Sequence, residues 1–133
     1  MRHPYLSHEV CVARLRDWYT RNGTLIIAFD FDNTVYDFHN KGHDYSEVTT
    51  LLQKAKRAGC YLIVFTGNPD TQLVRNFLQE KDIPYDVINE HAPFLDEKSK
   101  SARKIYYNVL LDDAAGLESA CRYLDCFLDS ALP

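Results

Sequence analysis

The segment LIIAFDFDNT, residues 25–34, is the most informative part of the chain for its fold. It opens with five apolar residues in succession, as in a strand that is buried on both faces of a parallel sheet. Two carboxylates, Asp30 and Asp32, follow at once, where this strand is expected to end. We therefore expect a buried strand that delivers two acidic side chains to one edge of a sheet.

Three more apolar runs end in the same way, each at a polar residue: Tyr61–Phe65 before Thr66, residues 86–88 before Asn89, and residues 107–111 before Asp112. Stretches with apolar side chains at helical spacing lie between these runs. Strands that alternate with helices are typical of βαβ units, in which the strands run parallel. Because parallel strands present their carboxyl ends at one edge of the sheet, the four residues that follow the strands are expected to meet there.

Four helices are expected from the apolar stripes and from the residues at their ends. The first ends at Asn22-Gly23, the second has Ser46 as N-cap and Gly59 beyond its end, the third begins at Asn68-Pro69, and the fourth covers residues 117–128. Residues of these types are common at helix ends. The predicted fold is α/β: a three-layer, Rossmann-like arrangement with a mainly parallel sheet and helices on both faces.

Length and composition favour one domain over residues 1–133. Of these residues, 46% are hydrophobic and 26% charged, as in an ordinary globular domain. We divide the chain into a helical extension (residues 1–23) and a core that contains a short flap (residues 33–45). With 19 acidic and 15 basic residues the net charge is −4, which argues against a nucleic-acid-binding surface. No apolar stretch reaches the ~18 residues of a membrane span, so no membrane association is expected.

The cysteines indicate neither a zinc site nor a disulfide framework. Cys11, Cys60, Cys121 and Cys126 form no CxxC pair, and such pairs are the usual signature of sulfur ligation. The N-terminal stretch carries charges every few residues and lacks the apolar run of a signal peptide. We therefore expect free thiols and a cytoplasmic location.

The acidic residues at the strand ends suggest a metal site. Asp30 and Asp32 lie two residues apart, and Asp112-Asp113 follows another strand that should end at the same edge. Carboxylates that gather closely repel one another, and a cation between them relieves that repulsion. Ligand sets made only of oxygen suit a hard cation, and Mg²⁺ is favoured because it also engages phosphate.

Three motifs stand at the ends of predicted strands: DFDNT at residues 30–34, FTGN at residues 65–68 and LLDD at residues 110–113. Together they resemble the motifs of the haloacid dehalogenase-like (HAD) hydrolase superfamily, in its minimal, cap-less phosphatase form. Their order and strand contexts agree with the family, and the resemblance covers about residues 24–128. The second aspartate of DFDNT favours a phosphatase, because dehalogenases of the family resemble only the first half of this motif.

The resemblance implies a role for each matching residue. Asp30 would be the nucleophile that forms an aspartyl-phosphate, and Asp32 the general acid and base. Thr66, with the backbone N–H groups of Gly67 and Asn68 and the start of the following helix, would bind the phosphoryl oxygens.

The resemblance also implies that the four aspartates share the metal. Mg²⁺ would bind the carboxylates of Asp30 and Asp112, with Asp113 as a further ligand, and the backbone carbonyl of Asp32.

The lysine that steadies the phosphoryl group in this family has three candidates here. We rank Lys98 first and Lys100 second, because both can open a short helix that follows a loop starting at the catalytic edge. Lys104 ranks third: if a strand begins near residue 106, Lys104 lies more than ~20 Å from Asp112. An irregular segment at that point would bring Lys104 back toward the site.

No segment of the chain is long enough for a cap domain. The 13 residues 33–45 can form only a flap over the site. The expected site is therefore open, and phosphate on a small molecule or on a macromolecule fits it. Nucleotides, phosphosugars, lipid headgroups and phosphoproteins are all compatible with such a site.

Three alternatives compete with a phosphatase. A Mg²⁺-dependent nuclease also gathers aspartates at strand ends, but the negative net charge argues against it. A receiver-like signalling domain shares aspartate, threonine and lysine at strand ends, although its phosphorylated aspartate ends a later strand than its acidic pair. A catalytically silent binding module is the third.

Overall fold

The computed structural model describes residues 1–132 and contains a four-stranded sheet with surrounding helices. Its elements are η1 (Pro4–Leu6), α1 (His8–Asn22), β1 (Ile26–Asp30), α2 (Ser46–Arg57), β2 (Tyr61–Phe65), α3 (Thr71–Glu80), β3 (Val87–Ile88), α4 (Glu97–Ser101), β4 (Val109–Leu111) and α5 (Leu117–Ala131). Among these residues, no helix has both the length and the apolar character needed to cross a membrane.

All strands of the sheet run parallel, in the order β3-β2-β1-β4. β1 lies inside the sheet, paired with β2 on one side and β4 on the other, and Phe29 is aligned with Leu111. Asp30 and Asp112 each follow the aligned residue of their own strand, so the register alone brings them side by side. The predicted α/β fold is confirmed.

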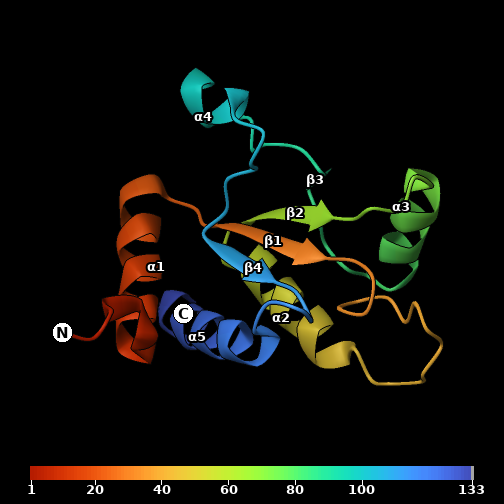
Figure 1. The fold of residues 1–133 in the computed structure, drawn as a ribbon, viewed down its shortest axis with the longest axis horizontal. Helices are drawn as coiled ribbons and strands as arrows, with labels where there is room; N and C mark the ends of the chain where they lie inside the picture. Colours follow the sequence, from red (N-terminus) through yellow and green to blue (C-terminus); the bar gives the residue numbers. More distant parts are fainter. Residues whose placement is uncertain (133) are drawn as a thin grey trace.

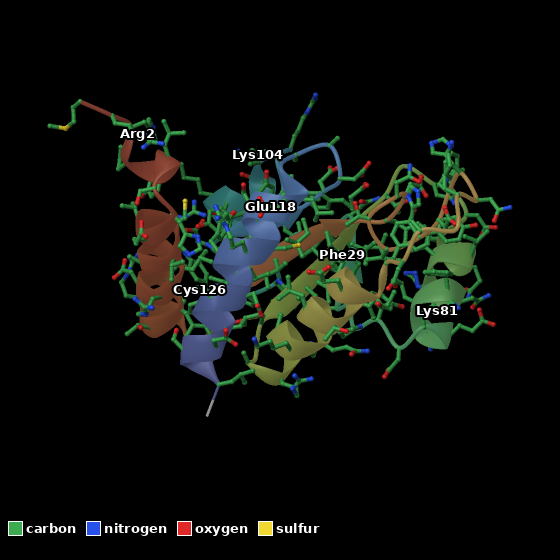
Figure 2. The ribbon with its side chains drawn as sticks, turned by 90° about the horizontal axis from the view of Figure 1, so that it is seen from below. Arg2, Phe29, Lys81, Lys104, Glu118 and Cys126 are labelled. Carbon is green, nitrogen blue, oxygen red and sulfur yellow. The ribbon has the colours of Figure 1, made fainter. Side chains whose placement is uncertain are left out.

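The two faces of the sheet are covered unequally. Helices α2, α3 and α5 pack on the face that carries Ile27, Phe29 and Leu62, and Figure 1 shows α2 and α5 beneath the sheet. Figure 2 shows these two helices lying across β1, where Phe29 is fully buried.

The opposite face is covered mainly by extended chain. Ile26, Ala28 and Ile63 of this face contact Ala92, Leu95 and Ile105, from the segment between β3 and β4. That segment contains one helix, α4, of five residues, which Figure 1 places above the sheet. The expected helical layer is thus reduced here to a single short helix, because residues 90–108 carry no apolar stripe at helical spacing.

The N-terminal helix packs beside α5 and the segment that precedes β4. α1 packs against α5, and it ends at Asn22, as predicted, with Gly23 in a left-handed conformation at φ 73°. Arg14 donates to the backbone carbonyl of Asn108 at 2.9 Å. Trp18 stacks on Tyr106 with the ring centroids 6.1 Å apart, so α1 also contacts the segment that leads into β4.

Two predicted helix starts are wrong, one by one residue and the other by two. Ser46 is the first residue of α2 rather than its N-cap, since Asp44 accepts a hydrogen bond from the Ser46 N–H at 2.9 Å. α3 begins at Thr71 and is capped by Asp70, which accepts from the Leu73 N–H at 3.1 Å. Asn68 accepts from the Asp70 N–H at 2.9 Å, and this side-chain turn precedes the helix.

Candidate metal and phosphate site

Three carboxylates meet at the carboxyl ends of β1 and β4. One oxygen from each of Asp30, Asp112 and Asp113 lies within 4.8 Å of the other two. Asp30 is the last residue of β1, and Asp112 and Asp113 directly follow β4. The parallel register creates this cluster, as expected from the sequence.

The three carboxylates repel one another in the absence of a cation. Burial, followed by the negative charges of Asp112 and Asp113, raises the pKa of Asp30 to about 7. A cation among these oxygens would reverse that effect, because it favours the ionised carboxylate. An oxygen-only donor set of two partly buried carboxylates and one exposed carboxylate fits Mg²⁺.

Thr34 links the two strand ends beneath this cluster. Its side chain is almost fully buried, and its hydroxyl oxygen accepts from the Asp113 N–H at 3.0 Å. The same hydroxyl lies 3.1 Å from Asp113 Oδ1 and 3.4 Å from Asp30 Oδ2. Thr34 was not among the predicted site residues. Its position in the DFDNT motif could have indicated a role, because a tight turn there brings the Thr34 N–H to the carbonyl of Phe31.

Asp32 lies next to the cluster but outside it. Its Oδ1 atom is buried and has no hydrogen-bond partner among the described residues. Its backbone forms an isolated bridge with Tyr36, which closes the turn after β1. An unpartnered buried acceptor costs about 1–3 kcal/mol, so a ligand proton at this oxygen would relieve that cost.

Thr66 is held at the end of β2 by Asn89. The Thr66 N–H donates to Asn89 Oδ1 at 3.0 Å, and Asn89 Nδ2 donates to the Thr66 carbonyl at 2.7 Å. The Thr66 hydroxyl accepts from the Asn68 N–H at 3.1 Å, so its own hydrogen can be donated to a ligand. Sequence reasoning placed Asn89 at this edge but did not recognise that it clamps Thr66.

Only part of the predicted phosphate-binding turn remains available. The Asn68 N–H is already bonded to Thr66, whereas the Gly67 N–H makes no hydrogen bond among residues 1–132. The start of α3 is occupied by the carboxylate of Asp70. The carboxylate at this helix start counts against its predicted role in binding the phosphoryl group, which stays a prediction.

The structure brings Lys104, rather than Lys98 or Lys100, to Thr66. A hollow of about 370 Å³ is lined by Phe65, Thr66, Asn89, Arg103, Lys104, Ile105 and Tyr107. Lys98 and Lys100 lie on α4 and do not line it. Lys100 instead pairs with Glu97 at 3.0 Å.

The ranking of the lysines was based on a strand that begins too early. β4 starts at Val109, and residues 102–108 form no regular structure. The distance of ~20 Å assumed a strand extended from about residue 106. The irregular segment brings Lys104 back toward the carboxyl edge, and His91 Nε2, 2.8 Å from the Ala102 carbonyl, anchors its start.

The flap of residues 33–45 is short and internally bonded. Asp37 accepts from the N–H groups of Lys41 and Gly42 at 2.9 and 2.8 Å. Tyr36 stacks on Phe31 with centroids 4.8 Å apart and contacts Phe77 of α3 edge to face. The flap is thus tied to the core at one end, through Tyr36.

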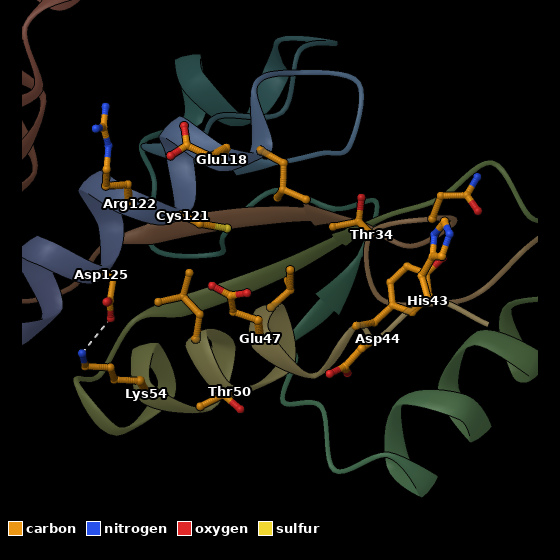
Figure 3. Close-up of a pocket in the computed structure, with 15 residues that line it drawn as sticks. Thr34, His43, Asp44, Glu47, Thr50, Lys54, Glu118, Cys121, Arg122 and Asp125 are labelled. Carbon is orange, nitrogen blue, oxygen red and sulfur yellow. Dashed lines mark hydrogen bonds and ion pairs between the residues drawn. The ribbon is translucent and has the colours of Figure 1, made fainter. Parts of the chain in front are cut away.

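A larger groove, of about 980 Å³, lies between α2 and α5. Figure 3 shows it running from Thr34 to the ion pair of Lys54 and Asp125, which are 2.7 Å apart. Asp30, Asp112 and Asp113 do not line it. Thr34, which also lines the groove, is the link between the groove and the carboxylate cluster.

The cysteines take no part in the site. All four are unpaired, as expected. Burial raises the pKa of Cys60 to about 12 and that of Cys121 to about 11. These two thiols therefore stay protonated at neutral pH, which makes them poor nucleophiles and poor metal ligands.

Comparisons with known proteins support the fold and go no further. No family model and no curated protein matches the sequence. Among solved structures, a conserved protein from Bacteroides thetaiotaomicron matches with a TM-score of 0.55 and 18% sequence identity; the match covers 70% of this chain and 78% of that chain. At this identity the similarity shows a shared α/β fold.

Proposed function

We propose that this protein is a Mg²⁺-dependent phosphatase of the HAD type that hydrolyses a phosphate monoester. The observation that carries the proposal is the cluster of Asp30, Asp112 and Asp113, whose oxygens lie within 4.8 Å of one another. The raised pKa of Asp30 supports it, because it marks a site that lacks compensating positive charge. Thr66 and Lys104 lie together at the same edge, as phosphoryl ligands would.

In the proposed reaction the phosphoryl group passes through Asp30. A carboxylate oxygen of Asp30 attacks phosphorus, and the leaving oxygen departs with a proton from Asp32. Asp32 then takes a proton from water, which attacks the aspartyl-phosphate, releases inorganic phosphate and restores Asp30. Asp32 suits this proton transfer because its Oδ1 atom is not committed to any protein partner among the described residues.

The remaining side chains bind and orient the phosphoryl group. The Thr66 hydroxyl, the Gly67 N–H and the Lys104 ammonium would donate to its oxygens. Mg²⁺, when bound, would neutralise the charge between the anionic nucleophile and the anionic substrate. Asp30, Asp112, Asp113 and the backbone carbonyl of Asp32 would hold it. Lys104 takes the place that sequence reasoning gave first to Lys98.

The decisive experiment measures phosphate release. With Mg²⁺ and p-nitrophenyl phosphate, the protein should release inorganic phosphate and leave DNA and RNA intact. Asp30→Asn should lose about 10³-fold or more of kcat/KM, whereas Asp17→Asn, on the exposed face of α1, should match the wild type. Unchanged activity in Asp30→Asn would rule out the mechanism, and cleaved nucleic acid would favour the nuclease.

The proposed setting is a reducing compartment such as the cytoplasm, since all four cysteines are unpaired. The proposed substrate is phosphate on a small molecule or on a macromolecule, because the short flap leaves the carboxylate cluster without a cap domain.

A further inference from the structure

The hollow beside Thr66 is lined by a second cationic side chain, to which the proposed reaction gives no role. Arg103 and Lys104 both line it. Lys104 alone is enough to bind the transferred phosphoryl group, so Arg103 is left over. Within residues 1–132, neither side chain takes part in an ion pair. Two exposed cations without an ion-pair partner among the described residues thus line one hollow, in a chain whose net charge is −4.

The backbone on both sides of Arg103 is held in place. Ala102, just before it, accepts a hydrogen bond from His91 Nε2 at 2.8 Å if that nitrogen carries the proton. Ile105, two residues after it, packs on the buried face of the sheet with Ile26 and Ile63. The backbone of Arg103 is therefore fixed on both sides, at Ala102 and at Ile105, which restricts where its side chain can reach.

Part of the lining of the hollow is apolar and aromatic. Phe65 and Tyr107 meet edge to face with their centroids 5.9 Å apart, and Ile105 lies beside them. Thr66, Asn89 and the two cations line the same hollow. The hollow is shallow and open to solvent, and its volume of about 370 Å³ leaves room for more than a phosphate group.

We propose that Arg103 binds a second anionic group on the leaving group of the substrate. The ligand would be a phosphate monoester whose leaving group carries a flat or apolar body, against Phe65 and Tyr107, and a carboxylate or a further phosphate, against Arg103. Guanidinium binds either anion through two parallel hydrogen bonds. This inference rests on the proposed function, because it assumes that the transferred phosphate lies at Thr66 and Lys104.

The test compares substrates that differ only in the second anion. Phenyl phosphate, 4-carboxyphenyl phosphate and hydroquinone bisphosphate are hydrolysed by the wild type, Arg103→Gln, Arg103→Lys and Arg57→Gln. Arg57 is an exposed residue on α2 and serves as a matched control. The wild type should favour at least one doubly anionic substrate by about tenfold in kcat/KM, as one charge-assisted hydrogen bond provides. The carboxylate and the bisphosphate arms identify which anion is preferred.

In Arg103→Gln the ratio of kcat/KM for the doubly anionic substrate to that for phenyl phosphate should fall to about one. The value for phenyl phosphate itself should change less than threefold. Arg103→Lys should keep part of the preference, and Arg57→Gln all of it. A wild type without preference, or a preference that survives in Arg103→Gln, overturns the inference. Equal losses for all three substrates also overturn it, because they would show a general structural role.

A binding measurement separates this inference from the proposed function. The affinity of Asp30→Asn for phenyl phosphate and for 4-carboxyphenyl phosphate is measured by calorimetry in Mg²⁺, with and without Arg103→Gln. A tenfold tighter binding of the carboxylated ligand that requires Arg103 supports the inference even if the wild type hydrolyses neither compound. Equal binding of both ligands overturns it, whatever the activity.

Discussion

The carboxyl edge of the sheet has an acidic half and a basic half that are built differently. The acidic half, with Asp30, Asp112 and Asp113, follows from the register of β1 and β4 and is held by Thr34. The basic half, with Arg103 and Lys104, comes from an irregular segment that runs beside Thr66. The pairing of β1 with β4 places the acidic half, whereas the irregular segment before β4, which crosses one face of the sheet, places the basic half. Regular structure thus fixes the proposed chemistry, and irregular structure supplies the groups that would bind the substrate.

After the loss expected for Asp30→Asn, the next largest effect is expected in the basic half. Lys104→Met should reduce kcat/KM by about 10²–10³-fold, since it removes a donor to the developing charge on the phosphoryl group. Lys98→Met and Lys100→Met should each change it less than threefold, because these residues lie on α4, away from the hollow. Steady-state kinetics on p-nitrophenyl phosphate measures all three. A large loss in Lys98→Met together with an intact Lys104→Met would restore the order that sequence reasoning favoured.

A smaller effect is expected where Thr34 joins the strands of the acidic half. Thr34→Val keeps the shape of the side chain but removes the hydroxyl that contacts Asp113 and Asp30. Apparent affinity for Mg²⁺, from titration of activity, should fall about 10–100-fold, as when outer-shell partners of metal ligands are lost. Thr20→Val, exposed on α1, is the control. Unchanged Mg²⁺ affinity would show that the register of the strands alone positions the carboxylates.

The smallest effect concerns stability without metal. Asp30 has an ordinary pKa of 3.8 when unfolded, and burial together with Asp112 raises it to about 7 in the folded chain. Between these values the folded state holds more protons than the unfolded state, so the contribution of Asp30 to stability falls as the pH rises from about 4 to about 7. Thermal unfolding in EDTA should therefore occur at a lower temperature at pH 7.5 than at pH 5.

Two comparisons isolate the contribution of Asp30 from that of other titrating groups. Asp30→Asn should flatten this pH dependence, and Mg²⁺ should raise the unfolding temperature of the wild type at pH 7.5 more than that of Asp30→Asn. Identical pH profiles for the wild type and Asp30→Asn in EDTA would contradict the raised pKa.

Much of the fold was predictable because strong local patterns determine it. The apolar run before Asp30 became β1, and the C-terminal helix was predicted from its apolar stripe. The start of α3 was missed because Asn68 and Asp70 both have the side chains of a helix cap, and tertiary structure determines which of them caps the helix. The helical layer predicted for the second face is largely missing. The segment that covers this face is held there by single buried side chains such as Ala92, and its sequence has no periodic apolar pattern.

The site was predictable where it depends on strand ends and not where it depends on irregular chain. Asp30, Asp112 and Asp113 come together because parallel register places them together. Lys104 was ranked last because strand geometry was extended over residues that are not a strand. Asn89 and Thr34 act through hydrogen bonds to residues 23 and 79 positions away, and partners at such separations cannot be recognised from one sequence.

The stacking of Trp18 on Tyr106 gives the protein an internal optical reporter. The chain has one tryptophan, and its ring lies 6.1 Å from a tyrosine that is two residues beyond Lys104. Any shift of the segment that carries Arg103 and Lys104 changes the surroundings of this indole. Emission from Trp18, in the unlabelled protein, should therefore follow ligand capture at the basic half in real time.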